Sequence, residues 1–81
     1  MAVDFDKYDR LVDARGKRCP IPAVMTKIAI DDYEPGAVIL VLSQDKGSLK
    51  DVPREAQKNN AEVLGVLEEN ELIKILIRKP G

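Results

Sequence analysis

The chain is short and nearly neutral in charge. It has 81 residues, of which 44% are hydrophobic and 33% charged, with a net charge of −1, one cysteine and no histidine. This size fits one small domain, and the balanced charge argues against a protein that wraps nucleic acid or lies on an anionic membrane. The absence of histidine excludes the Ser-His-Asp triad and the Cys-His pair of proteases.

Apolar spacing predicts six elements in the order β-α-β-α-β-β. Residues 1–7 have no periodic pattern and are predicted to be loose, so that residues 8–81 form the single domain. The predicted strands are residues 8–14, 37–42, 61–67 and 72–77, and the predicted helices begin at Ile21 and cover residues 49–59. The turns between them are predicted at Pro35-Gly36 and Glu69-Asn70.

Both helices have an apolar stripe that should face a core. We expect Ser48 to cap the second helix, because Asp51 follows it by three residues as in a capping box. Two helices and four strands in this order predict an α/β (α+β) two-layer sandwich, with a mixed four-stranded sheet and both helices on one face. The stripe residues are Ile21, Val24, Met25, Ile28 and Ala29 in the first helix, and Leu49, Val52 and Ala56 in the second.

The single cysteine, Cys19, lies where the first helix should begin. Pro20 suits a helix start and restricts the residue before it to extended geometry, so Cys19 is predicted at or next to the N-cap. The helix dipole there stabilises a thiolate or a persulfide, and Arg15, Lys17 and Arg18 add positive charge nearby. The alternative is a buried, inert thiol, which is the commoner fate of a lone cysteine. The charged flanks, and a stripe that begins only after Cys19, favour a reactive thiol.

The motif around this cysteine resembles that of the TusA/SirA family of small sulfur-carrier proteins. The matching residues are Asp13-Ala14-Arg15-Gly16 and Cys19-Pro20-Ile21-Pro22, which correspond to D-x-R-G-x-x-C-P-x-P. The resemblance extends over residues 11–81 and implies the sandwich fold predicted above. It also implies that Cys19 carries a persulfide sulfur, that Pro20 and Pro22 form its scaffold, and that Asp13, Arg15 and Gly16 belong to the ordered loop before it.

The resemblance also implies partners. A cysteine desulfurase or a rhodanese would donate the sulfur, and a downstream protein would accept it for tRNA thiolation, sulfur oxidation or cofactor assembly. Lys17 stands where the family usually has an apolar residue. With Arg18 and Lys27 it is either a solvated face or a docking site for an acidic partner surface.

Other interpretations of the sequence remain open. Cys19 could serve a thiol-based redox or regulatory interaction module, although no resolving cysteine is present in the chain. An RNA-binding domain is less favoured, because stacking aromatics are scarce and the net charge is negative. We expect no metal site, no cofactor, no membrane contact and no direct nucleic-acid contact. A cytoplasmic monomer is predicted, since one cysteine and no apparent signal peptide suit a reducing compartment. Whether such a carrier counts as an enzyme is open.

Overall fold

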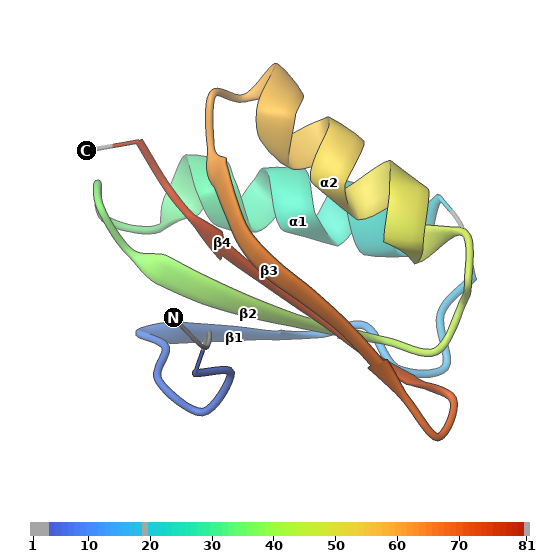
Figure 1. The fold of residues 1–81 in the computed structure, drawn as a ribbon. Helices are drawn as coiled ribbons and strands as arrows, with labels where there is room; N and C mark the ends of the chain where they lie inside the picture. The colour runs from blue at the N-terminus through green and yellow to red at the C-terminus, as the bar shows by residue number, and fades with distance from the viewer. Residues whose placement is uncertain (1–3, 19, 81) are drawn as a thin grey trace.

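The computed structural model describes residues 4–18 and 20–80. Figure 1 shows α1 and α2 packed on one face of a β-sheet, which confirms the predicted two-layer sandwich. The element boundaries differ from the predicted ones by one or two residues, as is usual for helix and strand ends. The elements are β1 (Arg10–Asp13), α1 (Ile21–Asp32), β2 (Val38–Ser43), α2 (Ser48–Lys58), β3 (Glu62–Glu69) and β4 (Leu72–Arg78).

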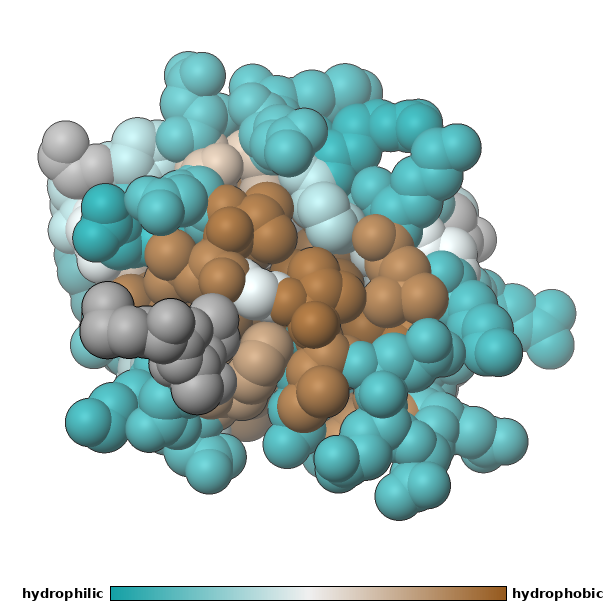
Figure 2. Space-filling model, in the orientation of Figure 1, coloured by the Kyte–Doolittle hydropathy of each residue, from teal (hydrophilic) through white to brown (hydrophobic). Residues whose placement is uncertain are grey.

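The sheet has the strand order β1-β2-β4-β3 and is mixed. β1 is parallel to β2, as a crossover through α1 requires, and the other two pairs are antiparallel. Alternate residues of each strand face the helices, and those of the two central strands are fully buried. These core residues are Ile39 and Val41 of β2 and Ile73, Ile75 and Ile77 of β4. Figure 2 shows apolar side chains gathered below α2, which itself presents hydrophilic side chains at the top of the view.

The two edge strands differ in character. β3 contains a register shift between Val63 and Gly65 and carries Glu62, Glu68 and Glu69. A bulge and charged side chains are the usual protection of an exposed edge against pairing with another chain. β1 has no such register shift in its pairing with β2.

Two turns depend on positive φ angles. Asn70 and Glu71 have φ of 49° and 67°, which suits the tight hairpin between β3 and β4. The turn lies one residue later than predicted, because β3 continues to Glu69. Gly36 has φ of +82° in the turn before β2, a conformation that glycine adopts without strain.

The predicted buried face of α1 was wrong for three of its five residues, whereas Ala29 is buried and Met25 packs against the core as predicted. Ile21, Val24 and Ile28 are 44%, 46% and 53% exposed, so much of the apolar stripe faces outward. Small side chains are buried instead, because they let the helix approach its neighbours closely. Thr26 can be buried among them because its hydroxyl donates to the Pro22 carbonyl at 2.8 Å. The buried residues of α1 are Pro22, Ala23, Thr26, Ala29 and Ile30.

The predicted capping role of Ser48 was also wrong. The N-cap of α2 is Gly47, which has no side chain to cap the helix, and its backbone N–H donates to Asp45 Oδ1 at 2.8 Å. The Ser48 hydroxyl is buried and lies 2.7 Å from the hydroxyl of Ser43 at the end of β2. As predicted, α2 buries Val52 and Ala56 fully, while Leu49 is partly buried against the core. Neither helix in the described part of the chain is long and apolar enough to cross a membrane.

Candidate functional site

The candidate site is the loop that connects β1 to α1. Cys19 itself lies outside the described residues, but the loop on both sides of it is described. The predicted motif residues before and after the cysteine are therefore placed by the strand that enters this loop and the helix that leaves it.

Asp13 and Arg15 fix the conformation at the start of the loop. The Arg15 guanidinium donates from Nε to Asp13 Oδ1 at 2.9 Å and from Nη2 to Oδ2 at 2.8 Å. The backbone N–H of Arg15 also donates to Oδ1, at 3.1 Å. These bonds, first of all those from the guanidinium, lower the pKa of Asp13 from 3.8 to about 2. The D-x-R spacing thus closes a bidentate pair within three residues, and this pair orders the loop.

Gly16 joins this loop to the one between β2 and α2. It has φ of +79°, and its backbone N–H donates to the Gln44 side-chain Oε1 at 3.0 Å. Gln44 was not predicted to have a role, because it lies 28 positions away from Gly16 in the sequence. Gly16, Lys17, Arg18, Gln44 and Asp45 line a shallow cavity of about 380 Å³. Asp45 therefore sets a carboxylate beside the predicted basic loop.

The first turn of α1 begins immediately after the cysteine in sequence. Pro20 is the N-cap residue. Cys19 was predicted at or next to this cap, and it lies outside the described residues. The N–H of Ile21 donates to the Arg18 carbonyl at 2.8 Å, and the N–H of Val24 donates to the Pro20 carbonyl at 3.0 Å. Pro22 occupies the second helical position and is buried, where its missing N–H costs little.

Charges along α1 are placed against the preference of the helix dipole. The first turn has no acidic residue and the last turn no basic one. Lys17 and Arg18 precede the helix, while Asp31 and Asp32 end it. The dipole favours the opposite arrangement, so these charges lower the stability of the helix. Lys27, which the sequence predicts to share a basic surface with Lys17 and Arg18, forms an ion pair with Asp31 at 3.0 Å.

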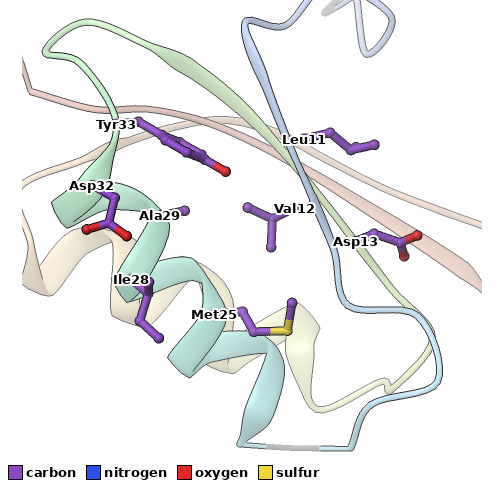
Figure 3. A pocket seen from close by; sticks show the side chains of 8 residues that line it. All are labelled: Leu11, Val12, Asp13, Met25, Ile28, Ala29, Asp32 and Tyr33. Carbon is purple, nitrogen blue, oxygen red and sulfur yellow. The ribbon is translucent and has the colours of Figure 1, made fainter.

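An apolar groove runs between α1 and the edge strand β1, with a volume of about 350 Å³. Figure 3 shows Asp32 and Tyr33 towards one end of the groove and Asp13 at the other, with Met25 and Val12 between them. The outward-facing stripe of α1 contributes Met25 and Ile28 to its wall. The sequence analysis identified this apolar stripe, but predicted that it packs against the core rather than forming the wall of a groove.

Comparison with known proteins identifies the family. A family model described as "Sulfurtransferase TusA" matches residues 10–79. The chain belongs to the TusA/SirA family. A SirA-like protein from Desulfitobacterium hafniense has a similar crystal structure, with a TM-score of 0.77 at 27% identity, covering 90% of this chain and 100% of that chain.

Named relatives of this TusA/SirA chain include bacterial and archaeal proteins. "Putative sulfur carrier protein YrkI" of Bacillus subtilis is 33% identical over 73 residues, which is 90% of this chain and 97% of that protein. A "Putative sulfur carrier protein" of Archaeoglobus fulgidus is 36% identical over 69 residues, which is 85% of this chain and 94% of that protein. These matches support a sulfur-carrier role for this member of the family.

Proposed function

We propose that this protein is a sulfur carrier whose Cys19 alternates between a thiol and a persulfide. The observation that carries the proposal is the ordered loop before Cys19, in which the bidentate Asp13–Arg15 pair precedes two basic residues and the start of α1. A helix start next to positive charge stabilises a sulfur anion. The family membership and the names of the relatives support the same role.

The proposed reaction needs no external oxidant. The Cys19 thiolate attacks the terminal sulfur of a persulfide on the donor enzyme. The donor's S–S bond breaks as the new S–S bond to Cys19 forms, and the donor cysteine leaves as a thiolate. A second transfer of the same kind passes the sulfur to an acceptor protein. The chain therefore needs one cysteine and no resolving thiol.

In this proposal the other motif residues support Cys19. Pro20 and Pro22 stiffen the first turn of α1, and Gly16 allows the loop to turn into it. Lys17, Arg18 and Lys27 contact the acidic surface of a partner. Lys17 and Arg18 form no ion pair among the residues described, so both are available to an acidic partner surface. Lys27 would have to break its ion pair with Asp31 in order to contact that surface.

The proposed donor is a cysteine desulfurase or a rhodanese, and the acceptor is a further relay protein that leads to tRNA thiolation, sulfur oxidation or cofactor assembly. The carrier would act as a monomer in a reducing cytoplasm, where a single free cysteine persists.

Intact-mass measurement tests this function directly. The chain is incubated with a cysteine desulfurase and cysteine, or with a rhodanese and thiosulfate. We expect a mass gain of about 32 Da, one sulfur atom, that a thiol reductant removes and that Cys19→Ser abolishes. Absence of the gain with both donors, while a known carrier is loaded in the same assay, would contradict the proposal.

A further inference from the structure

We infer that the groove between β1 and α1 binds an extended segment of the protein that exchanges sulfur with this chain, and that the segment adds to the sheet as a strand beside β1. This inference rests on the proposed function. The segment carries an apolar side chain for the groove and a basic residue for Asp32.

The first argument is the difference between the two edges of the sheet. Among residues 4–18 and 20–80, β1 pairs with β2 alone, so its other edge has unpaired backbone groups. Such an edge is a template for another strand, and the register shift seen on β3 is missing here. Arg10 and Asp13 are charged, but they stand at the two ends of β1 and leave Leu11 and Val12 at its centre.

The second argument is the apolar wall that α1 adds to this edge. Ile28 of α1 is 53% exposed and lines the groove together with Met25 and Val12, so an apolar surface flanks the edge strand β1. A large apolar side chain exposed at an apolar groove of a small domain indicates a contact surface. The groove of about 350 Å³ lies at the small end of the about 300–1,000 Å³ typical of ligand pockets, which suits one or two side chains rather than a whole helix.

The third argument is the charge at the two ends of the groove. The Asp13 carboxylate is neutralised by its bidentate pair with Arg15. The Asp32 carboxylate forms no hydrogen bond or ion pair with any residue that the structure describes, and Asp32 borders the groove at the opposite end. Lys79 donates from Nζ to the backbone carbonyls of Asp31 and Tyr33 at this end of α1, not to the Asp32 carboxylate. A lysine or arginine of the incoming segment could therefore pair with the Asp32 carboxylate.

The position of the groove suits a sulfur-transfer partner. α1 starts two residues after Cys19, and β1 ends six residues before it. Both walls of the groove are therefore continuous with the loop that carries the cysteine. A segment held against β1 would keep the rest of its protein close to this loop during transfer.

Loading kinetics test the inference with matched variants. With the donor that loads the wild-type chain, we expect Ile28→Glu to raise the KM for this carrier about tenfold and to leave kcat unchanged. Asp32→Lys should raise KM about threefold at low salt, with a smaller effect at about 1 M salt because the charge is screened. The control is Val66→Glu, a substitution of an apolar residue that is 44% exposed on the other edge strand. Its KM should match that of the wild type.

Strand addition itself has a separate readout. Amide hydrogen exchange across Arg10–Asp13 should slow when the donor enzyme is bound, and exchange across β3 should not change. Equal KM values for Ile28→Glu and Val66→Glu, or unchanged exchange in β1, would overturn the inference. So would a wild-type dimer that Ile28→Glu converts to a monomer without loss of loading, because the groove would then serve a second copy. If no donor loads the wild-type chain, that result contradicts the proposed sulfur-carrier function, and the assignment of the groove, which rests on this function, is contradicted as well.

Discussion

Ser48→Ala should destabilise the fold through Ser43, 5 positions earlier, rather than through the start of α2. The two hydroxyl groups lie 2.7 Å apart and are 0% and 1% exposed, so water does not replace a lost partner. Ser43 Oγ also accepts a bond from the Asp45 N–H at 3.2 Å. The pair therefore holds the loop whose Gln44 contacts Gly16 at the candidate site.

The size of the effect follows from this burial. Ser48→Ala leaves the buried Ser43 hydroxyl with the Asp45 N–H as its remaining partner, and loss of the bond to Ser48 costs about 1 kcal/mol. For a domain of this length, each kcal/mol lowers the melting temperature by about 4–8 °C. Ser43→Ala should cost at least as much, because the Asp45 N–H loses its acceptor as well. The double variant leaves neither hydroxyl unsatisfied, so its cost should be below the sum of the single costs by about 1 kcal/mol.

A double-mutant cycle measured by urea denaturation decides between the two roles of Ser48. A helix cap would also be worth about 1 kcal/mol, but its loss would cost the same whether or not Ser43 is present. Additive effects of Ser43→Ala and Ser48→Ala would therefore refute the pairing and restore the capping role. Unchanged m-values across the four proteins are needed for the comparison.

Three further predictions concern the site and the helix beside it. The Asp13–Arg15 pair should stabilise the protein fully above about pH 4 and lose its effect as the pH falls towards 2, because folding lowers the Asp13 pKa from 3.8 to about 2. The difference in melting temperature between wild type and Asp13→Asn should shrink over this range; a constant difference would contradict it. Ile30→Ala should cost about 2–5 kcal/mol and Ile28→Ala less than about 1 kcal/mol in urea unfolding, since Ile30 is 3% exposed and Ile28 53%. A larger cost for Ile28→Ala than for Ile30→Ala would mean that α1 is oriented as the sequence suggested. Alkylation rates of Cys19 against pH should show a thiol pKa below about 8.5, and an inflection at or above that value would remove the electrostatic argument for reactivity.

The sequence predicted the order and approximate limits of the elements because each has a strong local pattern. The apolar run of β2 and the alternating isoleucines of β4 contain their own periodicity, and Asn70 and Gly36 tolerate the positive φ that their turns require. Arg15 and Asp13 are two positions apart, so their pairing is also a local property of the chain.

The predictions that were wrong or missing concern features that are determined by tertiary contacts rather than by the local sequence. In α1, helical spacing identified an apolar stripe, but nothing local indicates whether a stripe meets the core or a partner. Ala23 and Thr26, which lie off the stripe, are buried because small side chains allow close packing. Ser48 has the spacing of a cap, yet the end of β2 brings Ser43 within bonding distance of its hydroxyl. Gln44 and Gly16 meet for the same reason, through the packing of two loops that are distant in sequence.

The unfavourable charges at the two ends of α1 have a consequence before any contact is made. Lys17 and Arg18 add to the positive end of the helix, and Asp32 adds to the negative end, so these charges increase the electric moment of α1 above that of its backbone alone. In the electric field of an approaching charged protein, such a moment rotates the carrier so that the end of α1 with the opposite charge faces that protein. The association rate should then fall with ionic strength more steeply than a net charge of −1 would suggest.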